Sequence, residues 1–321
     1  MPRGLALGVA LTVVSAFAFG SGALFAKPVY AAGVSWHVLM SWRFLLGAAA
    51  AWLWIAARPS ARAALAGMRR RNVAIAVGLG ILYTGNSATY YAGLETVSAS
   101  LAALIVYIYP AIVAVISLQV GQPLRGRRAW IALATALAGV ALAVGNIDQA
   151  TAPPLVGILL MLASPFIYSV WIVLAARLGG ENREEVGREA GAGADPTITG
   201  AIMLTATATT YWITALALGR QVLPDQIPGS AWVGILGVGV VSTFVAVQAF
   251  YAGAHRIGAA RASIVSTVEP IWTIALASLL FGESLGALQL LGGVLILAGV
   301  LLSQTGGGTR STATELRIAD E

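Results

Sequence analysis

A single glutamate, Glu269, stands in the middle of an apolar run and is the side chain best placed to do chemistry. It lies about eight residues into the run 262–281, directly before Pro270. A run of that length can span a bilayer, and a charge at its middle costs about 2.5 to 3.5 kcal/mol on insertion scales. Because burial favours the neutral form of a carboxyl group, Glu269 is a candidate proton site or a partner for a substrate amine. The alternative is a neutral acid that hydrogen-bonds to a neighbouring helix.

Arg43 is a second charged residue inside an apolar run, about six residues into 37–57. Two interpretations remain open. The guanidinium group can pair with an acid group of a substrate, or with a carboxylate such as Glu269 if the two helices adjoin. Alternatively, the long side chain snorkels to the nearer membrane surface, where its charge stays hydrated.

Polar and aromatic side chains recur at helical spacing and predict the wall of a cavity. Ser266, Glu269 and Thr273 follow i, i+3, i+7 and therefore share one face of a helix. Tyr90 and Tyr91 lie near a helix end, and we assign them to an interfacial aromatic belt. Besides Glu269 and Arg43, the residues that we expect to line the cavity are Tyr83, Asn86, Tyr107, Tyr109, Trp171, Gln248, Ser266 and Thr273.

Two prolines, Pro110 and Pro270, fall midway along apolar runs. Each removes a helical hydrogen bond and leaves one carbonyl, of Val106 and Ser266 respectively, without its usual donor. Inside a membrane such a carbonyl must be satisfied by another group or face a water-filled cavity. We predict hinges in gating helices at both prolines, with a plain structural kink as the alternative.

The two prolines belong to an internal duplication. Matching positions, all at an offset of 160 residues, are 90–93 and 250–253, Pro110 and Pro270, Gly126 and Gly286, and 137–140 and 297–300. A fixed offset held over about fifty residues indicates a repeat. The first helices of the halves match more weakly, at an offset of 149, through Gly8 and Gly157, Ser15 and Ser164, and Phe17 and Phe166.

The composition places these residues in a membrane protein. The chain has 321 residues, of which 58% are hydrophobic and only 10% charged, and its mean hydropathy is +0.84. Soluble domains carry roughly 25% charged residues. The net charge of +6 does not indicate nucleic acid, because the arginines flank apolar runs instead of forming a stripe. The absence of cysteine excludes disulfides, thiolate metal sites and a cysteine nucleophile.

We predict an all-α polytopic protein with ten transmembrane helices. The predicted helices are 5–26, 37–57, 73–94, 99–118, 129–146, 155–176, 198–218, 231–253, 262–281 and 286–303. The long connection 177–196 is rich in Gly and Glu without apolar periodicity, which predicts a disordered cytoplasmic loop. The tail 304–321 has the same character.

Arginine counting predicts the orientation. With the N-terminus inside, every basic cluster between helices falls on the cytoplasmic side, and the outer segments hold only Lys27 and Arg220. Both termini are then cytoplasmic. Five helices in each repeat, 5–146 and 155–303, make the second repeat inverted relative to the first, as in many secondary transporters whose substrate site lies at the repeat interface.

The run Glu269-Pro270-Ile271-Trp272, followed by Phe281-Gly282-Glu283 and the glycine-containing ending 290–302, closely resembles the second EamA domain of the drug/metabolite transporter superfamily. Arg43-Phe44 and the Tyr109-Pro110 region resemble the first. The resemblance implies a ten-helix exporter of small metabolites, often amino acids or related compounds, that works by alternating access. One departure is that the first repeat has Gly121-Gln122 where the second has Gly282-Glu283, the form common in the family.

The sequence thus predicts a multi-pass carrier in the cytoplasmic membrane that exports a small metabolite, with protons as a candidate coupling ion through Glu269. We expect no cofactor, no metal and no nucleic-acid partner. Because the repeat lies within one chain, a monomer could form the whole pathway. The alternatives are a passive channel or facilitator and an intramembrane enzyme, but the two histidines, His37 and His255, fall on opposite sides of the membrane and no catalytic motif accompanies them.

Overall fold

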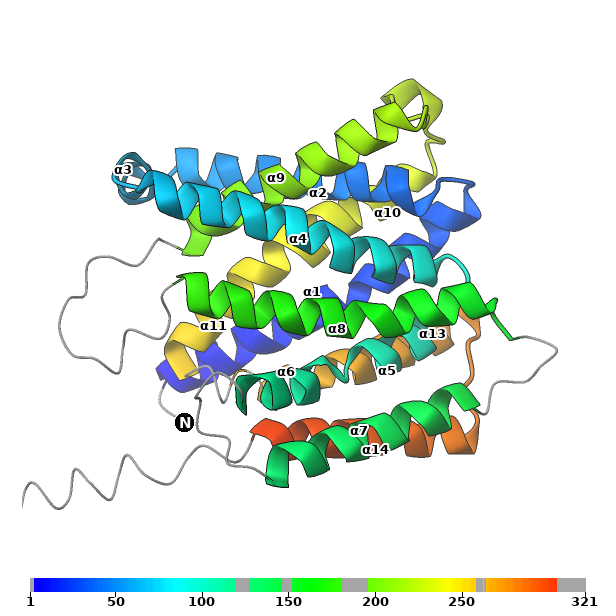
Figure 1. Ribbon diagram of the computed structural model, residues 1–321. Coiled ribbons are helices and arrows are strands. Elements are labelled where there is room, and N and C mark those ends of the chain that lie inside the picture. The colour runs from blue at the N-terminus through cyan, green and yellow to red at the C-terminus, as the bar shows by residue number, and fades with distance from the viewer. Residues whose placement is uncertain are drawn as a thin grey trace, which may run out of the picture.

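The computed structural model describes residues 3–118, 127–145, 152–179, 196–257, 262 and 264–304. The predicted loop 177–196 and tail 304–321 lie almost wholly outside the described residues. Within these ranges every regular element is helical, and the long helices lie roughly along a common direction (Figure 1). The all-α prediction is therefore confirmed for the described part of the chain.

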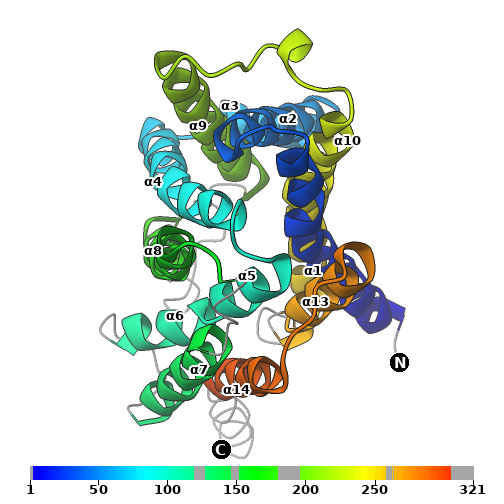
Figure 2. The same ribbon diagram turned by 90° about the vertical axis from the view of Figure 1, so that its right-hand side faces the viewer.

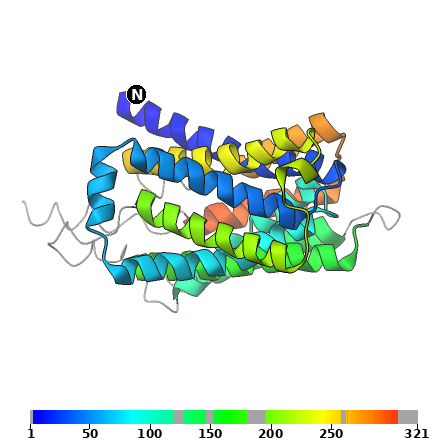
Figure 3. The same cartoon turned by 90° about the horizontal axis from the view of Figure 1, so that it is seen from above.

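The first half of the chain forms α1 (Arg3–Ala31), α2 (Trp36–Ala56), the short α3 (Pro59–Ala66), α4 (Arg70–Leu94), α5 (Ala99–Val106), α6 (Tyr109–Leu118) and α7 (Arg127–Gly145). The second half forms α8 (Leu155–Gly179), α9 (Pro196–Ala217), α10 (Ala231–Leu236), the π-helical η3 (Gly237–Val245), α11 (Ala246–Ile257), α13 (Val268–Phe281) and α14 (Ala287–Gln304), with one 3₁₀ turn, η2 (Pro224–Gln226), before α10. Seen from above, α3 crosses the ends of α2 and α4 (Figure 3).

Four stretches of the described chain are long and apolar enough to cross a membrane. They are Gly4–Ala31, Trp36–Ala56, Leu155–Ala175 and Ala231–Ala254. Shorter apolar helices accompany them at Ala99–Val113, Trp130–Val144, Val268–Phe281 and Ala287–Ser303. Many large apolar side chains on these helices face outward, as a lipid-facing surface requires. The fold is that of a multi-pass membrane protein, while the count of ten spans and the side of the termini stay predictions.

Corresponding helices of the two halves run in opposite directions (Figure 1). Their packing is also paired: α1 contacts α11 while α4 contacts α8, and the couples α2 with α9, α5 with α13, and α7 with α14 each join one half to the other (Figure 2). The sequence offsets match α1 with α8 and α4 with α11. The contact between α1 and α11 is therefore equivalent to the contact between α8 and α4. This arrangement is what an inverted repeat produces.

Two close glycine contacts between helices are also related by the inverted repeat. A Cβ added to Gly93 would lie 3.0 Å from the carbonyl oxygen of Gly157, and one added to Gly253 would lie 3.0 Å from that of Gly8. These two pairs are exchanged by the sequence offsets 160 and 149. Each glycine lets two helix backbones touch where any side chain would hold them apart.

Two buried serines at matched positions of the repeats form hydrogen bonds that also relate the two halves. Ser15 Oγ donates to the carbonyl oxygen of Ala246 at 2.7 Å. Its counterpart Ser164 donates to Oδ1 of Asn86, the residue that matches Ala246, at 2.9 Å. The weak match at offset 149 therefore marks positions that make equivalent contacts in the two halves.

The fourth and ninth predicted helices are broken. The run 99–118 divides into α5 and α6 at Tyr107-Ile108, and in the run 262–281 the helix α13 begins only at Val268, after a turn at Ser266-Thr267. The predictions of continuous helices were wrong at these points. The physical reason is proline, since Pro110 and Pro270 follow each break by two or three residues and cannot donate the hydrogen bond that would carry a helix through it.

Candidate functional site

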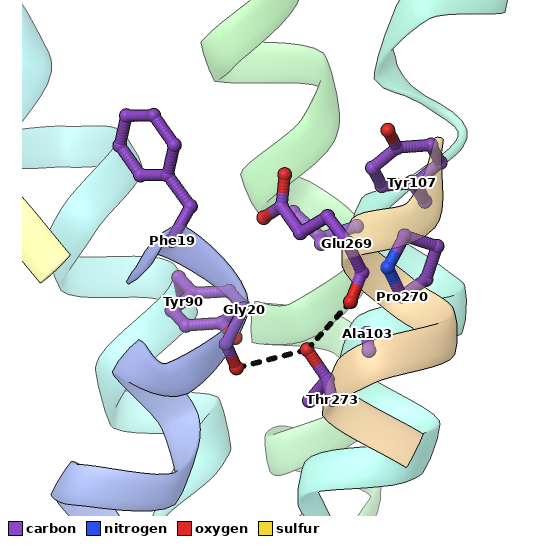
Figure 4. Close-up of a pocket in the computed structure, with 9 residues that line it drawn as sticks. Phe19, Gly20, Tyr90, Ala103, Tyr107, Glu269, Pro270 and Thr273 are labelled. Carbon is purple, nitrogen blue, oxygen red and sulfur yellow. Dashed lines mark hydrogen bonds between the residues drawn. The ribbon is translucent and has the colours of Figure 1, made fainter. Parts of the chain in front are cut away.

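Glu269 lies on the wall of a pocket between α1, α4, α5 and α13. About 250 Å³ of space not filled by atoms lies within the pocket, part of it open to the surroundings. It is lined by Phe19, Gly20, Tyr90, Ala103, Val106, Tyr107, Glu269, Pro270 and Thr273. In Figure 4 the Glu269 side chain extends from α13 toward the side of the pocket formed by Phe19. The part of the pocket that a water-sized sphere can occupy is only about 20 Å³, room for about one water molecule in this conformation.

The start of α13 is held against α1 by close backbone contacts. Thr273 Oγ1 donates to the carbonyl oxygen of Gly20 at 2.9 Å and also lies 3.1 Å from that of Glu269 (Figure 4). A Cβ on Gly20 would come within 2.8 Å of the Thr273 hydroxyl oxygen. The ring of Phe17, one turn before Gly20 on α1, stacks on that of Trp272 with 4.1 Å between ring centroids. The glycine therefore permits the approach that places Glu269 beside α1.

The carbonyl group released by Pro270 has a partner. The Tyr107 hydroxyl donates to the Ser266 carbonyl oxygen at 2.6 Å, and the Glu269 amide also reaches this oxygen at 3.0 Å. The Ser266 carbonyl oxygen is therefore satisfied by another group, which was one of the two possibilities for a carbonyl left free by proline. Tyr107 thereby joins the break in the fourth predicted helix to the break in the ninth.

An aromatic wall extends from the pocket toward α8 and α4. Tyr107 packs on Tyr109 at 5.9 Å between ring centroids, Tyr109 on Tyr168 at 4.9 Å, and Tyr168 on Tyr83 at 6.3 Å. Trp171 stacks on Tyr168 at 5.8 Å and donates from Nε1 to the carbonyl oxygen of Leu79 at 2.9 Å. The structure thus brings the predicted residues Tyr83, Tyr107, Tyr109 and Trp171 together.

Tyr168 and Phe19 were not among the predicted site residues. Tyr168 lies three residues before Trp171 on α8, so helical spacing alone places both on one face. Phe19 has no polar group and nothing in the sequence separates it from the other apolar residues of α1. Only the packing of α1 against α13 shows that it lines the pocket.

Arg43 is buried, with 7% of its surface exposed, so the snorkelling interpretation was wrong. Nor does Arg43 pair with Glu269 or another carboxylate among the described residues. Its Nε donates to Thr243 Oγ1 at 2.9 Å, and its guanidinium carbon lies 4.9 Å from the ring centroid of Phe44 and 4.7 Å from that of Tyr91. Cation–π contacts of this kind stabilise a buried cation that has no acidic partner.

The wide turns of η3 place the Arg43 partner. Thr243 Oγ1 donates to the carbonyl oxygen of Val238, five residues earlier, at 2.8 Å, and so accepts from Arg43 with its lone pair. Nearby Ser242 has a buried Oγ for which the described residues provide no hydrogen-bond partner. Gly239 permits close contact with α2, since a Cβ there would lie 3.2 Å from the Arg43 carbonyl oxygen. Short π segments of this type often occur at functional sites.

Other predicted residues have different places. Tyr91 is only 4% exposed and Tyr90 lines the pocket, so the assignment of both to an interfacial belt was wrong. Asn86 is buried and engaged by Ser164 instead of lining the Glu269 pocket. Gln248 is half-buried on α11 and does not line it either.

Chemically, the described residues provide a carboxyl group in a small pocket, a buried guanidinium group and a wall of phenol and indole rings. Tyr90 and Tyr91 connect the two charged groups, since Tyr90 lines the Glu269 pocket and Tyr91 packs on Arg43. The described residues contain no group of three or more His, Cys, Asp or Glu that could hold a metal ion. The arrangement suits reversible binding of a small polar solute.

Comparison with known proteins identifies a family of membrane transporters. The model of the EamA-like transporter family matches residues 6–145 and 155–305. An uncharacterized transporter of Archaeoglobus fulgidus is 27% identical over 233 residues, which cover 71% of this chain and 75% of that protein. The uncharacterized transporter YcbK of Bacillus subtilis is 26% identical over 297 residues, covering 90% of each chain. One crystal structure shares the fold, with a TM-score of 0.62 at 18% identity, over 95% of this chain and 99% of that chain.

Proposed function

We propose, from the premise that this chain belongs to the EamA-like transporter family, that it exports a small metabolite by alternating access across the cytoplasmic membrane. The observation that carries the proposal is Glu269 in a small pocket at the interface of the two repeats. Inverted-repeat transporters place their substrate and coupling-ion sites at this position.

The substrate that this site would accept carries an amine and an acid group, as an amino acid or related compound does. Glu269 would bind the amine or exchange it for a proton, because a single carboxyl group cannot hold both at once. Arg43 would attract the acid group, since it is a buried cation without a carboxylate partner among the described residues. The tyrosine wall adds flat apolar surface with hydroxyl groups at its edge.

Proton antiport follows from the same chemistry. A proton that enters from outside and binds Glu269 would release the solute there, and loss of the proton to the cytoplasm would prepare the site for the next solute. The carboxyl group suits this exchange because it is the acid that lines the pocket. One chain contains both repeats, so a monomer would suffice.

Solute counterflow in proteoliposomes tests the proposal. Vesicles loaded with an unlabelled compound are placed in a small amount of the labelled form, with amino acids, amines and carboxylates as the panel. A carrier accumulates label transiently above its equilibrium value, whereas a passive channel lets it only equilibrate. Equilibration without overshoot for a compound that clearly permeates would contradict the carrier proposal.

A further inference from the structure

The connection between α4 and α5 is tied to neighbouring elements by charged side chains. Lys27, in the last turns of α1, donates from Nζ to the carbonyl oxygens of Leu94 at 2.8 Å and Val97 at 2.6 Å. Glu95 accepts the amide of Trp36, the first residue of α2, at 2.6 Å. The distribution of arginines predicts that this end of the bundle is the outer one.

Glu283 ties the start of α5 to the end of α13 with two hydrogen bonds from one carboxylate. Its Oε1 accepts the Ala99 amide at 2.9 Å and its Oε2 accepts the Ser100 amide at 2.8 Å. These amides belong to the first turn of α5, where helical N–H groups have no partner within the helix and a negative charge is favourable. The carboxylate therefore caps α5 from the connection that follows α13.

Gly282 directs Glu283 toward α5. It has φ +65°, the left-handed conformation that ends α13, and its amide bonds back to Ser278. A residue with a side chain would resist this conformation. The Gly-Glu pair that the sequence analysis found to differ between the repeats thus acts as one unit, in which glycine makes the turn and glutamate makes the cap.

The cap bears on the Glu269 pocket because α5 and α13 both line it. Ala103 and Val106 of α5 face Glu269 and Pro270 of α13 across the pocket. At the opposite end of α5 the Tyr107 hydroxyl bonds to Ser266. The two helices are therefore fastened together on both sides of the pocket, at the outer end by the Glu283 carboxylate.

The inverted repeat lacks this charge at the other end. The sequence equivalents of Lys27 and Glu95 are Ala176 and His255, and that of Glu283 is Pro123 at the offset of 160, or Gln122 if Gly282 is aligned with Gly121. An exact inversion would assign these equivalents to the cytoplasmic end, where no carboxylate stands at any of the three positions. The free energies of the two alternating states of such a carrier depend on the difference between the contacts that close each end.

We propose that Glu283 is a positioning residue that latches the outer end of the transporter closed. This proposal rests on the alternating-access function proposed above. Breaking the two bonds from Glu283 frees the start of α5 from α13, and separation of these helices opens the Glu269 pocket to the outside. Lys27 supports the latch by holding the preceding connection to α1. Glu283 itself does not line the pocket.

Thiol labelling tests the latch without any knowledge of the substrate. Because the chain has no cysteine, Ala103→Cys creates a single thiol in the pocket. The measurement is the rate at which a membrane-impermeant maleimide labels this thiol from the outer side of oriented vesicles. We expect Glu283→Gln to raise that rate at least about fivefold, the lower end of usual coupling between sites, and Glu283→Ala to raise it further.

Two controls separate a latch from a general loss of structure. Asp225→Asn removes an exposed acid on the predicted outer side, and we expect no change in the rate. A merely structural role of Glu283 would speed labelling equally from both sides, whereas opening of the outer end speeds it from outside only.

Lys27→Met keeps the proposal testable if the Glu283 variants do not fold, and it too should speed labelling from outside. Equal outside rates in wild type and in every folded variant would overturn the latch, whatever counterflow shows. Failure of counterflow with every compound in the panel, together with faster outside labelling, would instead contradict only the choice of substrates or the carrier proposal.

Discussion

The two proline-bearing segments of the chain have the same backbone break and different chemistry. In the first half, Tyr107 and Ile108 divide α5 from α6; in the second half, the equivalent residues Thr267 and Val268 stand at the start of α13. Glu269 therefore occupies the position of Tyr109. The acid lines the pocket, while Tyr109 belongs to the aromatic wall.

This difference shows how a duplication can produce an asymmetric site. The repeat supplies two helices that break near a proline and contact each other across the bundle. Substitution at matched positions then supplies a carboxyl group on one side and a phenol on the other. Tyr107 of the first half connects the two segments by donating to the Ser266 carbonyl oxygen of the second half. Among the described contacts, no residue of the second half makes the equivalent hydrogen bond to the first.

The largest effect should come from removing the acid. We expect Glu269→Gln to lower solute flux by about 10- to 100-fold, since a hydrogen bond to a charged group contributes about 1.5 to 3 kcal/mol. The measurement is initial counterflow with an identified substrate. Tyr109→Phe is the matched change at the equivalent position, and a loss of flux as large as that of Glu269→Gln would show that the two positions do not differ as described.

Overfilling the contact that supports Glu269 should be the next largest effect. Gly20→Leu would force a side chain against Thr273 and the Glu269 carbonyl, and overpacking of this kind costs about 1 to 3 kcal/mol. We expect a lower midpoint of thermal unfolding in detergent. Gly78→Leu is the control, because a Cβ at Gly78 meets nothing within 4 Å. Equal midpoints for both variants would contradict the close contact.

A smaller change should follow Tyr107→Phe, which removes the donor to the Ser266 carbonyl oxygen. Leaving a buried acceptor without this partner costs about 1 to 3 kcal/mol, but here the Glu269 amide still reaches the same oxygen, so we expect the lower end of the range. Chemical denaturation or a thermal shift would measure it. Tyr109→Phe should leave stability nearly unchanged; if both variants lose the same stability, the bond to Ser266 has no special weight.

The smallest effect on stability should come from Pro270→Ala. Since the break is already satisfied by Tyr107, alanine can remain in the same conformation, and we expect a change within about 1 kcal/mol. The informative measurement is transport rate, which should fall if the hinge moves during the cycle. Pro110→Ala gives the comparison for the first repeat. Unchanged rates in both variants would reduce the prolines to plain structural kinks.

The internal repeat and the charged residues within apolar runs could both be recognised in the sequence. The offsets found in the sequence point to Ser15 and Ser164, which donate to residues at matched positions, and Glu269, which stands in an apolar run, lines a pocket. A repeated fold and an intramembrane charge both leave local marks in a sequence, while the role of Glu269 in transport stays a prediction.

The partners of those residues could not be predicted, because they depend on packing between distant helices. Arg43 offered a carboxylate or the membrane surface as partners, and the structure gives it Thr243 and two aromatic rings. Its helix contacts η3, whose wide turns have no clear signal in the sequence. Likewise, only the approach of α13 to α5 shows that Glu283 caps a helix and that Tyr107 satisfies Ser266.

The measurement that tests the central claim most directly is efflux of an identified solute from proteoliposomes under an imposed pH gradient, with wild type beside Glu269→Gln. An acidic exterior should accelerate wild-type efflux, because protons that enter through Glu269 replace the solute leaving the pocket. Efflux through Glu269→Gln should be slow and independent of the gradient. An equal response to the gradient in the two proteins would contradict the account and remove Glu269 from the transport cycle.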